Sequence, residues 1–178
     1  MLYSSGLPND EILASVHDEE RLKVVRATNN PAEHRNPIFD RLSKEAAELL
    51  DAPLALISLV EADKDIIYGQ SGLPAAISDV GYIDAQPSFC QLTIASEKPV
   101  VIDDALMVPT LRLFPSVVQL GVRAHLGIPL KIDGQLVGNC CVIDFRPRKW
   151  TEADVENLTV LAMQALEQLK QGRRDKST

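Results

Sequence analysis

Three cysteines are the residues of this 178-residue chain that carry the most reactive side chains. Cys90 stands at the expected start of a short helix, where the helix dipole would lower the pKa of its thiol and make it reactive. The alternative interpretation is a small, buried, apolar residue. Cys140 and Cys141 are adjacent in an expected strand, so their side chains point to opposite faces of a sheet. They cannot share a metal ion, and we expect both to pack in the core; no metal site is predicted.

Three other residues each allow two interpretations. His125 would face a pocket and bind a ligand or respond to pH, or it would simply be held by a hydrogen bond. Arg123 would bind an anion, or it would form a salt bridge with Asp103 or Asp104. Tyr68 would form a pocket wall or part of the sheet surface. The sequence by itself favours neither interpretation for Arg123 or Tyr68.

Signatures of the common enzyme classes are absent from the sequence. It contains no P-loop, no dinucleotide-binding glycine motif, no H-E-x-x-H and no C-x-x-C. Residues 69–72 lack the spacing of a nucleophile elbow. Adjacent carboxylates such as Asp103 and Asp104 diverge in an extended chain, so they do not indicate a paired acid and base. We therefore expect no catalytic activity.

Composition and length indicate one globular domain over residues 1–178, with a core at about 20–170 and a helical lead at 1–30. A net charge of −7 and a pI near 4.9 argue against binding to nucleic acid or to an anionic membrane. No apolar run reaches bilayer length, and the N-terminus has no secretory signal. The odd number of cysteines is typical of reduced thiols, so we expect a cytoplasmic protein.

These residues must be positioned by secondary structure, and the clearest predicted element is a hairpin over residues 126–144. Asp133-Gly134 separates two apolar runs, as expected for a type I′ turn. The second arm, residues 135–144, is almost uncharged, so it should lie in the middle of a sheet. Further strands are predicted at 54–60, 65–70 and 99–102, and helices at 10–26, 37–50, 87–96, from 115 to a Gly121 cap, and from a capping box at 151–154. Residues 75–86 are predicted to form a loop.

This order of elements predicts an α+β fold. We expect a central antiparallel sheet of five or six strands, with the terminal helices packed on one face and short helices and loops on the other. The apolar stripe of the last helix, Val155 to Leu169, is longer than one sheet face needs. We therefore predict a homodimer that uses this helix, the N-terminal helix or both, with Leu166 and Leu169 as the residues to test.

Several motifs in this order resemble the GAF domain, in particular the bacterial sensor type found ahead of histidine kinases and diguanylate cyclases. They are an SFC helix start at 88–90, a VV-x-DA segment at 100–105 and a G-x-R stretch at 121–123. An LCVID-like segment at 140–144, in which Cys140 stands where Leu is usual, is followed by Pro147-Arg148. The resemblance covers about residues 20–170. It implies a GAF/PAS-like sheet and a signal-transducing sensor whose ligand pocket lies between the sheet and its short helices. It also implies dimerisation through terminal helices and a signalling partner protein, either in a stand-alone sensor or in a fragment of a larger one.

The departures from the family pattern limit what the resemblance implies. The N-K-x-F-D-E pattern of cyclic-nucleotide-binding GAF domains and the Cys-His pair that attaches a bilin are both absent, so no cofactor is predicted. Gln91 and Leu92 follow the SFC start, where a histidine is common.

The pocket is expected between the central strand, the strand of Tyr68 and the short helix from Pro87. Its candidate lining is Tyr68, Phe89, Cys90, Thr93, Arg123, His125 and Cys140. Arg123 is the one fixed positive charge among them, so the expected ligand is an anion or a carbonyl compound.

Two alternatives stay open. One is an enzyme like free methionine-R-sulfoxide reductase, which resembles this chain in the cysteine at position 90. Its other cysteines have no counterpart here, because residues 123–125 stand in their place, so Cys141 or Cys140 would have to resolve the disulfide. The other alternative is a structural dimerisation module with a closed pocket.

Overall fold

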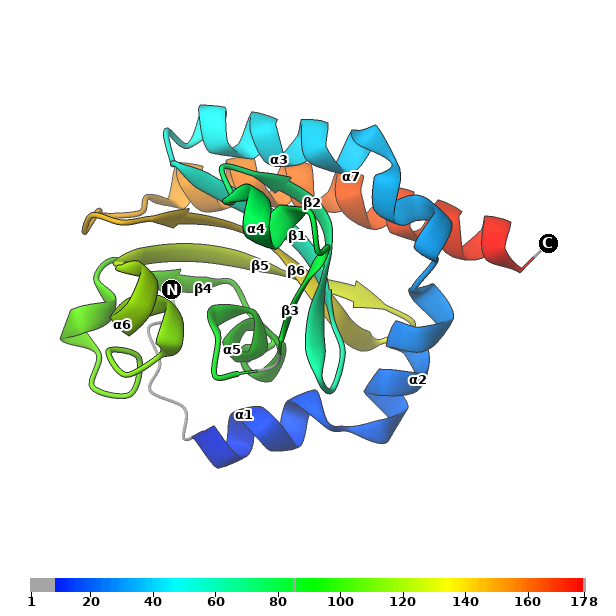
Figure 1. Cartoon of the computed structure of the whole chain (residues 1–178), viewed down its shortest axis with the longest axis horizontal. Helices are drawn as coiled ribbons and strands as arrows, with labels where there is room; N and C mark the ends of the chain where they lie inside the picture. Colours follow the sequence, from blue (N-terminus) through cyan, green and yellow to red (C-terminus); the bar gives the residue numbers. More distant parts are fainter. Residues whose placement is uncertain (1–8, 85, 178) are drawn as a thin grey trace.

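A computed structural model of the chain describes residues 9–84 and 86–177. Its centre is a six-stranded antiparallel sheet in the order β3-β2-β1-β6-β5-β4, with helices on both faces (Figure 1). The strands are β1 (Leu54–Val60), β2 (Lys64–Ser71), β3 (Tyr82–Asp84), β4 (Val100–Ile102), β5 (Ala124–Ile132) and β6 (Gln135–Asp144). The helices are α1 (Asn9–Val16), α2 (Glu19–Thr28), η1 (Pro31–Arg35), α3 (Pro37–Leu49), α4 (Ala75–Ser78), α5 (Phe89–Ser96), η2 (Ala105–Met107), α6 (Pro115–Leu120) and α7 (Glu152–Lys176). The predicted α+β fold class is confirmed.

Strand β6, the second arm of the β5–β6 hairpin, lies in the middle of the sheet as predicted. Asp133 and Gly134 have φ values of 50° and 77°, the positive values that a type I′ turn requires. β6 pairs with β5 on one side and β1 on the other, and nine of its ten residues are buried. Its apolar sequence therefore reflects cover on both faces.

Helices α3 and α7 lie side by side over one face of the sheet (Figure 1). The capping box of α7 is present, since the Thr151 hydroxyl accepts from the Asp154 amide and the Asp154 carboxylate accepts from the Thr151 amide. Leu166 and Leu169 are 8% and 2% exposed and belong to the core beneath α7. Leu166 and Leu169 are thus covered within one chain, so they are not available as a dimer interface.

The opposite face carries α5, with α1 packed on it and α6 beside it. The single helix predicted over residues 10–26 is wrong, because the chain forms two helices there. Asp18 caps α2 by accepting a hydrogen bond of 2.9 Å from the Arg21 amide, and this local capping interrupts the helix. As a result the lead reaches both faces: Ile12 and Val16 of α1 pack on the α5 side, whereas Val25 of α2 packs on the α3/α7 side.

The segment 75–86 also differs from the prediction. It contains the four-residue helix α4 and the three-residue strand β3, which pairs with Lys64–Ile66 at the sheet edge. Elements this short have no measurable period, so local pattern could not reveal them. Their position beside β2 shapes the surface described below.

Arg148 follows β6 in the chain and contacts both the end of β6 and the C-terminal end of α3. Its guanidinium donates to the carbonyl oxygens of Leu50 at 2.6 Å and Asp51 at 2.8 Å, and it lies 4.1 Å from the ring centre of Trp150. The carboxylate of Asp144 accepts from it at 3.4 Å. These contacts satisfy carbonyl groups at the C-terminal end of α3. The residues 144–150 therefore have a structural role in this chain.

Candidate functional site

Helix α5 is positioned by its cap and by one glycine of the sheet. The Ser88 hydroxyl accepts from the Gln91 amide at 3.2 Å and so starts the helix. Beneath α5, a Cβ atom on Gly127 would lie 2.9 Å from Thr93 Oγ1 and 2.6 Å from the His125 ring. Only glycine therefore allows α5 to approach β5 this closely.

Four of the seven predicted lining residues gather on this α5 side. Phe89, Cys90 and Thr93 project from α5, and the His125 ring of β5 stacks on Phe89 with 4.8 Å between ring centres. The Thr93 hydroxyl donates to the Phe89 carbonyl at 2.9 Å. All four side chains are buried, so this side of the sheet is closed by its own side chains.

Tyr68 and Cys140 lie elsewhere. Both belong to the core beneath α3 and α7, on the opposite face of the sheet. Cys140 follows strand alternation, because Cys141 faces α5. Tyr68 also follows alternation along β2, because Ile66 faces the same core and Ile67 faces the α5 side. The seven residues are therefore not brought together around one cavity.

Arg123 forms a salt bridge with Asp104, which is one of the two roles predicted for it. Its Nε and Nη2 atoms donate to the two carboxylate oxygens of Asp104, each at 2.8 Å. The hydrogen bond from Arg123 lowers the pKa of the Asp104 carboxyl. Because the guanidinium is already held by this bidentate pair, Arg123 supplies no free charge to the α5 side.

The three cysteines are free thiols, and all are buried. A hydrogen bond with Cys141, burial and the charge of Asp65 raise the pKa of Cys90 well above its usual range. Burial raises the pKa of Cys140 to about 12. Because these effects outweigh the helix dipole, the Cys90 thiol is protonated and shielded at neutral pH.

The α5 side contains polar groups that are not among the predicted lining residues. Asn139 Oδ1 accepts from the Ser58 hydroxyl at 2.9 Å, and that hydroxyl lies 3.9 Å from the Cys90 sulfur. Within the described part of the chain, Asn139 Nδ2 and both ring nitrogens of His125 have no hydrogen-bond partner, and neither has Asp65 Oδ1. Ser58 and Asn139 interrupt otherwise apolar strand segments, a signal that would have found them.

Burial shifts the pKa of two of these groups. It lowers the pKa of His125 to about 3, so the imidazole is neutral at physiological pH. It raises the pKa of Asp65 to about 7, against hydrogen bonds with Cys90 and Ser88 and the charge of Arg21, which lower it. The α5 side therefore offers neutral polar groups together with one carboxyl that titrates near neutral pH.

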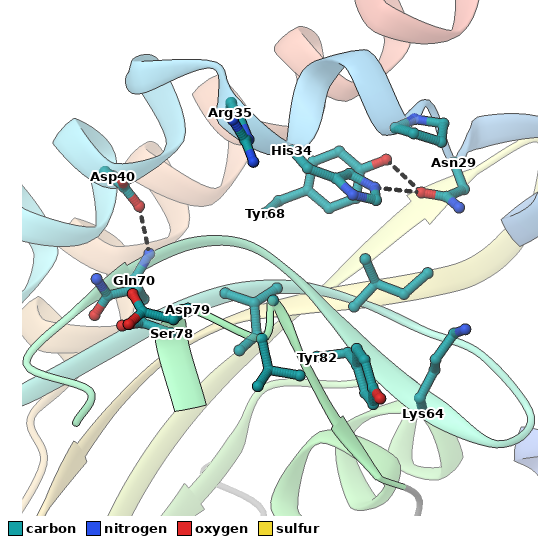
Figure 2. Close-up of a pocket in the computed structure, with 15 residues that line it drawn as sticks. Asn29, His34, Arg35, Asp40, Lys64, Tyr68, Gln70, Ser78, Asp79 and Tyr82 are labelled. Atoms are coloured by element: carbon teal, nitrogen blue, oxygen red, sulfur yellow. Dashed lines mark hydrogen bonds between the residues drawn. The ribbon is translucent and has the colours of Figure 1, made fainter. Parts of the chain in front are cut away.

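An open cavity lies at the sheet edge, and we call it the edge hollow. It has a volume of about 670 Å³ and is bounded by η1 and the start of α3 on one side and by α4 and β3 on the other, with β2 between them (Figure 2). Tyr68 is the only predicted lining residue on its wall. Its other polar lining residues include Asn29, His34, Arg35, Asp40, Lys64, Gln70, Ser78, Asp79 and Tyr82. The sequence did not reveal this cavity, because one of its sides is formed by residues 75–86, which were predicted to be a loop.

The wall formed by residues 29–35 also contacts the end of α7. Asn30 Nδ2 donates to the Gly172 carbonyl at 3.0 Å, and Lys176 Nζ donates to the Asn29 carbonyl at 2.7 Å. A Cβ atom on Gly172 would lie 2.7 Å from Glu33 Cγ, so glycine permits this close contact. One wall of the edge hollow therefore contacts the last turns of α7 directly.

Residues 9–84 and 86–177 contain neither a metal-binding cluster nor a membrane-spanning helix. No three His, Cys, Asp or Glu side chains in these ranges are grouped as a metal site requires. None of the helices in the same ranges combines the length and apolar character needed to cross a bilayer.

Comparison with known proteins gives a family and a fold. Residues 34–169 match the family described as GAF domain. No curated protein matches the chain.

Three solved structures resemble the chain at low sequence identity. The GAF domain of an Acinetobacter phosphoenolpyruvate-protein phosphotransferase has a TM-score of 0.65 at 17% identity, covering 94% of this chain and 97% of that one. A domain of a Sinorhizobium meliloti two-component sensor histidine kinase protein has a TM-score of 0.62 at 18% identity, covering 80% and 96%. Free methionine-R-sulfoxide reductase of Neisseria meningitidis, in complex with its substrate, has a TM-score of 0.61 at 18% identity, covering 99% and 98%. At these identities the likeness concerns the fold alone.

Proposed function

Because the chain belongs to the GAF family, we propose that it is a cytoplasmic signalling sensor that binds a small molecule on the α5 side and catalyses no reaction. This proposal rests on buried polar atoms of the α5 side that have no hydrogen-bond partner among residues 9–84 and 86–177. They are led by Asn139 Nδ2 and the two nitrogens of His125. A buried donor or acceptor that lacks a hydrogen bond raises the free energy of the folded state by about 1–3 kcal/mol. A ligand that supplies these bonds when α5 moves would therefore be bound.

The expected ligand differs from the one inferred from Arg123, because Arg123 is engaged by Asp104. The available groups are an amide donor on Asn139, a neutral imidazole and the carboxyl of Asp65. They favour an uncharged molecule that carries both carbonyl and hydroxyl or amide groups.

A thermal-shift screen of small metabolites followed by hydrogen exchange tests this proposal. We expect a hit to raise the melting temperature of the wild type and to slow exchange in residues 89–96, while Asn139→Leu abolishes both effects. Asn157→Leu, at an exposed position of α7, is the matched control and should respond as the wild type does. A hit that leaves residues 89–96 unprotected, or that Asn139→Leu binds equally well, would place the ligand elsewhere.

The enzyme alternative rests on Cys90, which lies on the same side of the sheet as Cys141. Against it, a buried thiol with a raised pKa is a poor nucleophile. We expect no thiol-dependent reduction of free methionine sulfoxide by the purified chain. Robust turnover that disappears in Cys90→Ser would replace the sensor proposal with the reductase. A structural dimerisation module would instead show neither turnover nor any ligand.

A further inference from the structure

We propose that the edge hollow is a second binding site and that its ligand is a small zwitterion carrying a carboxylate and an ammonium group, such as an amino acid or a short peptide. This site is separate from the α5 side and does not depend on the function proposed above. Its volume of about 670 Å³ lies within the range typical of small-molecule sites.

The cavity exists because of how the sheet ends. β3 pairs only with residues 64–66 of β2, so the rest of β2 has no neighbouring strand on this edge. η1 and α3 rise on one side of the open edge, and α4 lies on the other (Figure 2). The carboxylate of Asp40 accepts from the Gln70 amide at 2.9 Å, so at this point the backbone edge is already occupied. This contact disfavours an added β-strand and leaves side chains to recognise a ligand.

The wall of the cavity is held rigidly by hydrogen bonds. The Tyr68 hydroxyl accepts from the Asn30 amide at 2.9 Å and donates to Asn29 Oδ1 at 2.8 Å. His34 Nε2 lies 2.8 Å from the same Oδ1 and therefore donates to it, which leaves Nδ1 as an acceptor. The His34 ring packs edge-on against Tyr68 with 4.8 Å between ring centres. A wall fixed in this way lowers the ordering cost of binding.

The charges on the walls have both signs. Arg35 of η1 and the carboxylate of Asp79, which follows α4, stand on opposite sides of the cavity (Figure 2). Within the part of the chain that the structure describes, neither side chain has an ion pair or a hydrogen bond, and the two are not paired with each other. Lys64 adds a second cation, with its ammonium 5.5 Å from the centre of the Tyr82 ring. Asp40, the other carboxylate of the wall, is engaged by Gln70.

This arrangement determines the class of ligand. A simple anion held by Arg35 would leave the Asp79 carboxylate on the opposite wall unpaired, and a simple cation held by Asp79 would leave Arg35 unpaired. A molecule with a carboxylate at one end and an ammonium group at the other satisfies both walls at once. Arg35 would hold its carboxylate, and Asp79, next to the Ser78 hydroxyl, would hold its ammonium group.

NMR titration of the ¹⁵N-labelled full chain tests the proposal. The probes are glycylglycine and each of the common amino acids, with acetate and ethylammonium as single-charge controls. We expect at least one zwitterion to shift the amide signals of Tyr68 and Gly81, and both single-charge probes to bind at least about tenfold more weakly. If acetate or ethylammonium binds as tightly as every zwitterion, or if no zwitterion binds at millimolar concentration, the proposal is wrong.

Charge-neutral variants then locate the two ends of the ligand. Arg35→Gln and Asp79→Asn should each weaken the best probe by at least about tenfold. Arg41→Gln and Asp63→Asn, which are exposed and outside the cavity, should bind it as the wild type does. Melting curves confirm that all four variants are folded. Unchanged binding by both cavity variants would overturn the assignment even if a zwitterion binds elsewhere.

Discussion

At the scale of single residues, Asp65 and Arg21 are the charged groups whose burial has the largest consequences. Arg21 is 3% exposed, and its guanidinium donates to the carbonyl oxygens of Val16 at 2.6 Å and Leu136 at 3.1 Å. It ties the start of α2 to the end of α1 and to β6. Burial lowers its pKa to about 10, so it stays charged at neutral pH. Its charge favours the ionised form of Asp65, but burial of Asp65 has the larger effect.

Asp65→Asn should therefore change how stability depends on pH. The pKa of Asp65 rises from 3.8 in the unfolded chain to about 7 in the folded one, so its contribution to stability is fully present below about pH 4 and is lost as pH rises through about 7. The difference corresponds to roughly 4 kcal/mol. We expect the free energy of unfolding of Asp65→Asn, relative to the wild type, to increase between about pH 5 and about pH 8.5. Urea denaturation at both pH values measures this difference.

Asp63→Asn is the matched control for this measurement, because Asp63 is exposed in the turn before β2. Its free energy of unfolding should differ from that of the wild type by the same amount at both pH values. A pH-independent difference for Asp65→Asn would show that the Asp65 carboxyl does not titrate in this range.

At the scale of elements, the outer surface of α7 is the part of this helix that remains available for contact with a second copy of the chain. Val160 and Met163 are 60% and 46% exposed, one helical turn apart, while the inner face of α7 is buried against the sheet and α3. Residues three apart on a helix are neighbours on its surface, so these two side chains form one apolar pair that faces away from the core. We propose that a homodimer forms through this outer surface of α7.

Replacing both Val160 and Met163 by Glu should therefore give a folded monomer, measured by light scattering and by melting temperature. Leu166→Asp and Leu169→Asp should instead unfold the chain, because each places a carboxylate in the core. A double variant that stays dimeric, or a wild type that is already monomeric, would remove α7 as the interface.

At the scale of the whole molecule, two cores share one sheet. The core beneath α3 and α7 and the core beneath α5 are both built on β1 and β6, whose alternate residues belong to one core or the other. Loss of either core would expose apolar faces of the same central strands. The two sides are thus expected to unfold together as one domain.

Trp150 makes this expectation measurable. It is the single tryptophan of the chain, is 1% exposed, and its indole donates to the Ile102 carbonyl at 3.0 Å. We expect urea unfolding curves from tryptophan fluorescence and from far-ultraviolet circular dichroism to coincide in one transition. Separate midpoints would show that the two sides unfold independently.

The sequence by itself determined the features that depend on neighbouring residues. The Asp133-Gly134 turn, the Gly121 cap of α6 and the capping box of Thr151 each follow from local backbone requirements, and the structure shows all three. The central position of β6 also followed from its apolar composition, because only a strand covered on both faces can be so apolar. The order of short motifs was sufficient to identify the GAF fold.

Only the tertiary structure decided which side chains meet. Tyr68 lies beneath α3 and beside the edge hollow, on the opposite face from α5, and pairing with Asp104 occupies Arg123. The edge hollow itself is formed by η1, α4 and β3, which are too short to leave a pattern in the sequence. The physical reason is that strand alternation fixes only that successive side chains point to opposite faces. The face that each one occupies, and the groups it finds there, depend on segments distant in the chain.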